Sequence, residues 1–208
     1  MENINNKVYI TGKIVSDFQY SHQTYGEKFY LFNVSALRTS GYEDVILVII
    51  SERLIDTKQS YVGQYISIEG QYRSYNRHEE VGSRLLLTVF AKDCELIDTD
   101  IIGDSSNQIE LCGYICKEPS YRKTPLGREI ADIMLAVNRP YGKSDYIPCI
   151  CWGRDARFVA DFTVGGHIQI QGRIQSREYV KKISKDEKEK RIAYEVSVSK
   201  LEVIEDED

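Results

Sequence analysis

The chain has 208 residues, a formal net charge of −5, and 42% hydrophobic and 28% charged residues, which is typical of a globular protein of one large or two small domains. No window approaches the roughly 18 apolar residues that a membrane helix needs, and the N-terminal residues are polar, so we expect a cytoplasmic protein with no membrane partner. The five cysteines include no CxxC pair, which argues against a disulfide framework or a zinc site.

Alternating apolar and polar residues predict five strands in the first half of the chain. They cover residues 7–16, 28–38, 44–51, 64–74 and 84–96. A short helix is predicted within residues 52–62, between the third and fourth strands. Residues 45–50, VILVII, are apolar without alternation, which predicts a strand covered on both faces.

The second half repeats this order. Strands are predicted over residues 108–117, 129–138, 145–152, 167–179 and 191–203, with a helix within 154–164. The repeat is direct: residues 6–14 match 107–115, residues 62–74 match 164–176, and residues 84–97 match 191–204, at offsets of 101, 102 and 107. Such a regular offset predicts two copies of one domain.

We place these domains at residues 1–99 and 107–208, joined by a short polar segment. Five strands with one helix after the third are the order of an OB-fold, so the predicted fold class is all-β, with two tandem OB-folds. Another five-stranded barrel is the alternative.

Charge is distributed unevenly between the copies. Residues 113–182 contain 12 Lys and Arg against 7 Asp and Glu, whereas residues 1–112 contain 10 against 16. A nucleic-acid partner is therefore compatible with an acidic chain, provided that it binds the second copy.

The segment DYIPCICWGR, residues 145–154, holds the only tryptophan. On a strand, Tyr146 and Trp152 share one face, and the small apolar Cys149 and Cys151 share the other. The cysteine face suits a core. The aromatic face is either also buried or forms a flat platform on the surface.

The second copy resembles bacterial single-stranded-DNA-binding proteins. The residues that carry the resemblance are NQIELCG at 107–113, TPLGREIADIMLAVNR at 124–139, DYIPCICWGR at 145–154 and VGGHIQIQGRIQSREY at 164–179. The first copy resembles the same family more faintly through residues 26–34, 50–54 and 62–76. Two such domains in one chain resemble the tandem form found in some firmicutes.

The resemblance implies sequence-independent binding of single-stranded DNA in replication, repair or recombination, with no cofactor, metal or catalytic residue. It implies that surface aromatics stack on bases, and the matching residues are Trp152, Tyr146, Tyr141 and Tyr179. Cations beside them are expected to contact phosphates. These are Arg139, Arg154, Arg173, Arg177, Arg122, Lys123 and Lys143. Residues 181–191 form either a charged hairpin tip that folds over DNA or a solvated loop.

The first copy lacks most of these aromatics. Val45 and Ser51 stand where the second copy has Tyr146 and Trp152. Tyr42 and Tyr75 remain as candidate stacking residues, and Arg38, Arg53 and Arg73 as weaker phosphate contacts. We therefore expect the second copy to hold most of the DNA.

The resemblance also implies a homodimer with four OB-folds and contacts with replication or recombination proteins. The chain ends EVIEDED, without the short apolar tip that recruits partners in the family. A primosome-type accessory module that acts mainly through protein contacts is the alternative function. A nuclease on the same barrel is disfavoured because no carboxylates have metal-ligand spacing.

Overall fold

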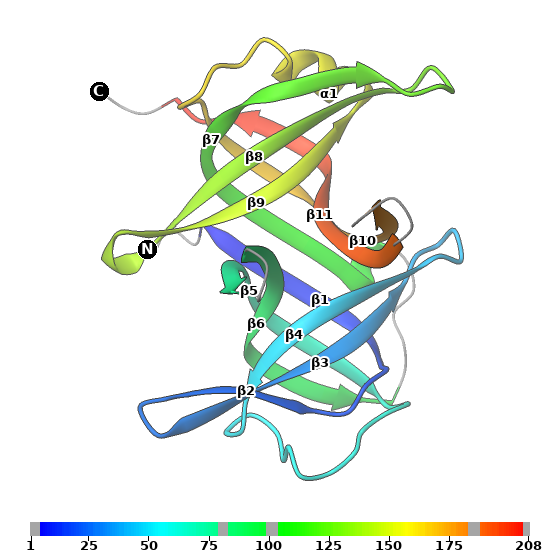
Figure 1. Ribbon diagram of the computed structural model, residues 1–208, viewed down its shortest axis with the longest axis vertical. Helices are drawn as coiled ribbons and strands as arrows, with labels where there is room; N and C mark the ends of the chain where they lie inside the picture. The colour runs from blue at the N-terminus through cyan, green and yellow to red at the C-terminus, as the bar shows by residue number, and fades with distance from the viewer. Residues whose placement is uncertain (1–4, 79–82, 99–103, 183–187, 206–208) are drawn as a thin grey trace.

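The computed structural model describes residues 5–78, 83–98, 104–182 and 188–205, and Figure 1 shows two barrels stacked along the long axis. The first barrel contains six strands. They are β1 (Asn6–Ile14), β2 (Gln19–Thr24), β3 (Glu27–Leu37), β4 (Glu43–Ser51), β5 (Tyr65–His78) and β6 (Ser83–Ile97).

The second barrel contains five strands, one α-helix and two short 3₁₀ turns. They are η1 (Asp104–Ser106), β7 (Asn107–Lys123), β8 (Glu129–Arg139), η2 (Pro140–Gly142), β9 (Lys143–Trp152), α1 (Gly153–Val159), β10 (His167–Lys182) and β11 (Lys188–Val203).

Both barrels close in the same way. In the first, β4 pairs parallel with β6, and β1 pairs antiparallel with both β3 and β5. In the second, β9 pairs parallel with β11, and β7 pairs antiparallel with β8 and β10. The side chains that point into each barrel are mostly Ile, Val and Leu, and nearly all of them are fully buried. This arrangement confirms the predicted fold class of two tandem OB-folds.

The two barrels share one continuous sheet. Strand β1 pairs antiparallel with β7, with Val8 opposite Ile109 at the centre of the ladder. The order β6-β5-β1-β7-β10-β11 therefore crosses the junction without a break. Because the equivalent strands run antiparallel and the equivalent residues Val8 and Ile109 face each other, the barrels are related by a pseudo-twofold axis at this pairing.

Glycine at the register shift in β10 allows two strands to approach closely. Strands β10 and β11 shift register between Gln171 and Gly172. A Cβ atom on Gly172 would lie 2.1 Å from the carbonyl oxygen of Ser197, so no other residue fits without moving the backbone. Gly70 holds the same place in the first barrel.

Two sequence predictions need correction. The helix expected within residues 52–62 is absent, and the segment forms turns. The Asp56 carboxylate accepts hydrogen bonds from the backbone N–H of Lys58 and from Gln59 Nε2, and such local bonds compete with a helix. Strand β2, which forms a hairpin with β3, was not predicted.

The remaining strands and α1 lie within a few residues of their predicted places. In α1, Ala156 and Val159 are buried against the barrel and anchor the helix. Residues 45–50 are buried or half-buried throughout, as predicted. The domain limits at residues 99 and 107 stay a prediction, because residues 99–103 lie outside the described part of the chain.

Within the described residues, no helix is long and apolar enough to cross a membrane.

Candidate nucleic-acid interface

Strand β9 carries the predicted alternation. Ile147, Cys149 and Cys151 point into the barrel and are almost completely buried. Tyr146 and Trp152 point outward and expose 50% and 38% of their surface. Of the two readings that the sequence leaves open, the structure therefore favours the surface platform.

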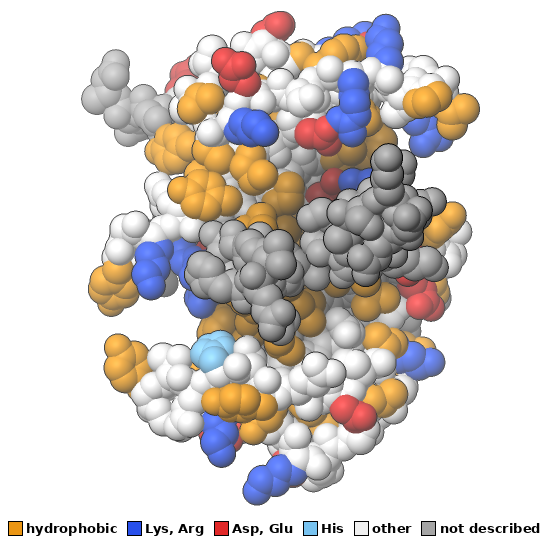
Figure 2. All heavy atoms as spheres, in the orientation of Figure 1, with side chains coloured by type: hydrophobic (Ala, Val, Ile, Leu, Met, Phe, Trp, Pro, Cys, Tyr) orange, Lys and Arg blue, Asp and Glu red, His pale blue; other side chains and the backbone are white. Residues whose placement is uncertain are grey.

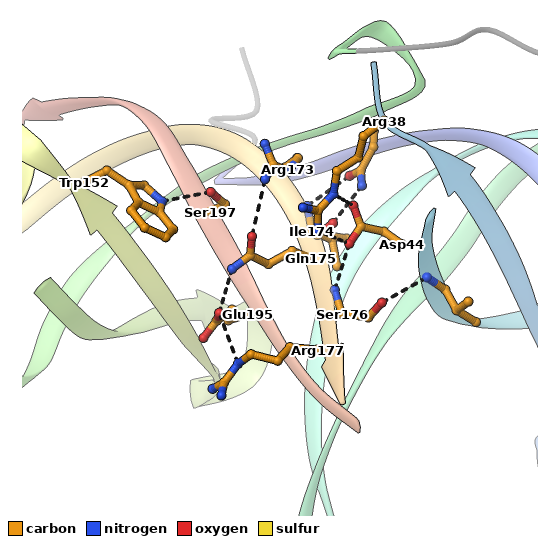
Figure 3. Close-up of polar contacts among 12 residues, drawn as sticks. Arg38, Asp44, Trp152, Arg173, Ile174, Gln175, Ser176, Arg177, Glu195 and Ser197 are labelled. Atoms are coloured by element: carbon orange, nitrogen blue, oxygen red, sulfur yellow. Dashed lines mark hydrogen bonds and ion pairs between the residues drawn. The ribbon is translucent and has the colours of Figure 1, made fainter. Parts of the chain in front are cut away.

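The indole of Trp152 is anchored at its edge. Its Nε1 donates a hydrogen bond to Ser197 Oγ at 3.0 Å, and Ser197 lies on the neighbouring strand β11. The bond satisfies the polar N–H while the ring remains exposed, which restricts the orientation of the ring. Figure 3 shows the indole lying over the surface of β11.

A hollow of about 1060 Å³ begins beside Trp152 and extends across β11 and β10 to β1 of the first barrel. Its cationic lining comes from both barrels. The residues are Lys7, Arg38, Arg128 and Arg173. Glu69 and Glu110 also line it. A negatively charged chain that contacts Trp152 would thus meet Arg128, Arg173 and Lys7 in this hollow, together with the two glutamates, whereas Arg38 is already paired with Asp44.

Side chains on β10 and β11 hold one another in position between Trp152 and the junction. Arg173 Nη2 donates to Gln175 Oε1 at 3.4 Å, and Gln175 Nε2 donates to Glu195 Oε1 at 2.6 Å. Arg177 Nε lies 3.9 Å from the same carboxylate oxygen. Figure 3 shows this chain of contacts running along the two strands. The network orders two of the predicted cations, Arg173 and Arg177, on the outer surface.

The other predicted aromatics lie in different settings. Tyr141 in η2 has a positive φ of 66° and is almost wholly exposed, and Tyr42 is exposed in the turn before β4. Tyr75 on β5 is half-buried. Tyr179 belongs to β10, but its side chain lies outside the described part of the chain. The same holds for all side chains of the predicted hairpin tip at 181–191, and for the backbone of residues 183–187.

Arg38 and Arg139 have a structural role that the sequence prediction missed. Arg139 binds both carboxylate oxygens of Asp145 through Nε and Nη2, and Arg38 binds Asp44 in the same way. Both aspartates are fully buried, and only about a quarter of each arginine side chain is exposed. Both arginines therefore form structural ion pairs, and a phosphate contact from either stays a prediction.

These ion pairs join the barrels. Asp145 Oδ1 accepts a bond from the backbone N–H of Ser74 in the first barrel, at 2.6 Å, and Ser74 Oγ accepts one from the N–H of Tyr146 at 2.7 Å. Related by the pseudo-twofold axis, Asp44 accepts from the N–H of Ser176, and Ser176 Oγ accepts from the N–H of Val45. We call these two arrangements the interdomain clasps. One of them fixes the backbone at Tyr146.

The remaining predicted cations are mostly exposed. Arg154, in the first turn of α1, exposes 91% of its side chain and lies 3.8 Å from Asp155. Three of the others pair with acidic side chains, and one is exposed at one end of a strand. Arg122 pairs with Asp132, Lys123 with Glu129 and Arg53 with Glu27, and Lys143 is exposed at the start of β9. The cationic partners are exposed in all three pairs, but Glu27 and Glu129 are largely buried, so only the Arg122–Asp132 pair is a weak surface pair that opens easily.

The first barrel has an aromatic side chain, at the height of Trp152 along the barrel, that the comparison of the two sequence repeats missed. Phe90 on β6 occupies the position of Ser197, and Ser51 on β4 that of Trp152. The aromatic ring at this position is therefore on β6 in the first barrel, whereas it is on β9 in the second barrel, and β6 corresponds to the neighbour of β9. The sequence offset of 107 between β6 and β11, which places Phe90 opposite Ser197, was the signal that could have revealed it. Arg73, a predicted phosphate contact, lies instead over the Phe90 ring, 3.9 Å from its centroid.

The thiols on the inner face of β9 allow a chemical test of the fold. Burial raises the pKa of Cys151 to about 12, with the nearby Asp155 as a second cause. At pH 8 only about one thiol in 10⁴ would be ionised, and the thiolate is the reactive form. We expect Cys151 to resist a thiol reagent in the native protein and to react on denaturation, with mass spectrometry to locate the label. Fast native labelling at pH 8 would contradict its burial.

The fold and the surface together define a tandem OB-fold protein with an outward aromatic strand beside a cationic hollow. Residues 106–204, which form the second barrel, match the sequence model of the Single-strand binding protein family. Over 80 residues the chain is 38% identical to Single-stranded DNA-binding protein 3 of Listeria innocua and to Single-stranded DNA-binding protein A of Bacillus subtilis. These matches cover 35% of this chain.

The chain spans about half the length of these curated relatives, 50% and 46% respectively. The solved wild-type single-stranded DNA binding protein of Thermus aquaticus is similar over both barrels. It superposes with a TM-score of 0.69 at 19% identity, covering 98% of this chain and 94% of that one. A deletion mutant of the same protein gives a TM-score of 0.71 at 18% identity. At this identity the likeness concerns the fold.

Proposed function

We propose that the chain binds single-stranded DNA without sequence preference, as a non-enzymatic protein of replication, repair or recombination. The observation that carries the proposal is the outward placement of Tyr146 and Trp152 on β9, at the mouth of a hollow with cations from both barrels. Aromatic stacking contributes about 1–3 kcal/mol per base and tolerates any base, because every base has a π-face. The names of the relatives support the same ligand.

In this proposal the residues have separate roles. Trp152 and Tyr146 stack on bases, and the exposed Tyr141 and Tyr42 extend the surface at the turns before β9 and β4. Tyr179 and Tyr75 stay candidates for further stacking. Phosphates are held by cations around the hollow and on the exposed rim. These are Arg173, Arg177, Arg154, Arg122, Lys123 and Lys143, with Arg53 as an extension on the first barrel.

The decisive experiment uses Trp152 as its own reporter, because it is the only tryptophan. Titration with oligo-dT at low salt is expected to quench its emission through base stacking. Unchanged emission, with binding detected by another method, would contradict a base on Trp152. No binding at all would reject the function.

Salt dependence tests the phosphate contacts. The logarithm of the binding constant falls with the logarithm of salt concentration by about 0.7 for each phosphate neutralised on a single strand. We expect Arg154→Ala to reduce this slope by about that amount. Lys58→Ala, which removes an exposed cation from a loop of the first barrel, is the control and should leave the slope unchanged. Equal slopes for all three proteins would exclude a phosphate contact from Arg154.

The same measurement addresses the alternative function. A primosome-type module that acts through a largely apolar protein interface would not lose affinity steeply with salt. We further propose that the protein acts in the cytoplasm as a homodimer, in which two chains bring four barrels together. Sedimentation at several concentrations tests the dimer independently of DNA.

A further inference from the structure

The first barrel carries a row of flat side chains across its outer surface, which we call the aromatic row: His22, Phe29, Phe90 and the guanidinium of Arg73. The His22 and Phe29 rings are stacked, with centroids 5.0 Å apart and planes 9° from parallel. Phe29 and Phe90 follow at 5.7 Å with a tilt of 33°. The carbon at the centre of the Arg73 guanidinium lies 3.9 Å from the Phe90 centroid. Four flat groups are thus in successive contact.

Strand pairing explains the row. His22 on β2 lies opposite Phe29 on β3, and Phe29 lies opposite Ser51 on β4. Phe90 on β6 is next, beside β4, and Arg73 comes from β5, the neighbour of β6. The row therefore crosses five adjacent strands at one level. In the second barrel, the same level holds Trp152 and Ser197.

The row is open at the surface rather than part of the core. Phe29 and Phe90 are only half-buried, and His22 is exposed. The core of the first barrel lies on the other side of these strands and contains neither phenylalanine. Figure 2 shows hydrophobic side chains on the front of both barrels, and Figure 1 places β3 and β4 on the same side of the molecule as β8 and β9.

The row ends close to the proposed DNA surface of the second barrel. Arg73 precedes Ser74, whose hydroxyl accepts the backbone N–H of Tyr146 at 2.7 Å. Arg73 is also near the Arg139–Asp145 clasp: burial lowers the pKa of Arg73, and the charge of Arg139 lowers it further while Asp145 opposes this. The row and the aromatic face of β9 thus meet at one interdomain clasp.

We propose that the aromatic row is a second nucleobase-stacking site, which takes bases of the same single strand that lies on Tyr146 and Trp152. The inference rests on the proposed function and extends it to residues of the first barrel at other strand positions. One base continues the stack on the exposed imidazole of His22 and another on the guanidinium of Arg73, both of which are flat. The positive charge of Arg73 at one end favours a polyanion over an apolar partner.

The test compares two labelled oligo-dT strands by fluorescence anisotropy, one of about 10 nucleotides and one of about 30, since an OB-fold covers about 4–16 nucleotides. The variants are His22→Ala, which removes the exposed ring at one end of the row, and Phe90→Leu, which keeps apolar volume but removes the ring against which the Arg73 guanidinium packs at the other end. We expect each to raise the Kd for the longer strand at least about fivefold, the loss for one stacked base, and to leave the Kd for the shorter strand unchanged.

Tyr20→Ala is the matched control. Tyr20 is exposed on the same hairpin as His22 and packs edge-on against Tyr30, away from the row, so its removal should not alter either Kd. If both row variants bind the longer strand as tightly as the unmodified protein, the row is not a base site. If they weaken self-association in sedimentation instead, the row is a contact between chains, which also overturns the proposal.

These outcomes are separable from the proposed function. Anisotropy measures affinity without reference to Trp152, whose emission is followed in parallel. If the oligonucleotide binds without quenching the Trp152 emission, Trp152 does not contact a base. The Kd values of the row variants would still show whether the aromatic row does. An unmodified protein that binds neither oligonucleotide would reject both proposals.

Discussion

Replacing Trp152 with alanine is expected to raise the Kd for oligo-dT by about 5- to 150-fold, the equivalent of 1–3 kcal/mol for one stacked base. The change removes a ring that is exposed, anchored to Ser197 and next to the cationic hollow. Anisotropy with a labelled strand is the appropriate measurement, because the variant has no tryptophan. The fold should persist, since the side chain contributes little to the core.

Tyr42→Ala is the comparison. Tyr42 is more exposed than Trp152 but lies in a turn and outside the residues that line the hollow. Its loss should change the Kd only slightly. Equal effects of the two substitutions would refute the proposed dominance of the second barrel.

Replacing Asp145 with alanine is expected to lower the free energy of unfolding by about 3–5 kcal/mol. The carboxylate is buried, pairs with Arg139 and accepts the backbone N–H of Ser74, so its loss leaves a buried cation and a buried donor unpaired. Denaturant unfolding followed by circular dichroism measures the change.

Asp132→Ala provides the control for that substitution. Asp132 also pairs with an arginine, Arg122, but both side chains are about half exposed. Pairs in water contribute roughly 0–1 kcal/mol, so the control should unfold almost like the original protein. Similar losses for both variants would show that the clasp contributes no more than a surface ion pair.

Periodicity and the internal repeat predicted most of the fold. Alternation along β9 separated Trp152 from Cys151 correctly, because a strand has a strict period of two. The helix predicted within residues 52–62 was wrong because the Asp56 side chain forms local hydrogen bonds that stabilise a turn instead. The repeat showed two domains but did not show how β1 and β7 would pair.

The site was predicted less completely, for a physical reason. The family resemblance identified aromatics on β9, and charge alone identified arginines. Charge cannot distinguish Arg154, which faces solvent, from Arg139, whose partner Asp145 is six residues away and fully buried. Nor does a sequence show that Phe90 on β6 lies at the same height in the first barrel as Trp152 on β9 in the second. That relation depends on pairing between distant strands.

The ladder between β1 and β7 lies within one chain. Two separate but identical subunits joined in this way would have to present the same residues on each side of their axis. Here a single gene encodes both sides, so each half can mutate alone, as Phe90 and Ser197 illustrate. A single DNA strand bound across both barrels would contact two unlike surfaces in a fixed order. Its two possible 5′-to-3′ orientations would therefore differ in binding free energy. The covalent linkage also keeps the pair together at any dilution.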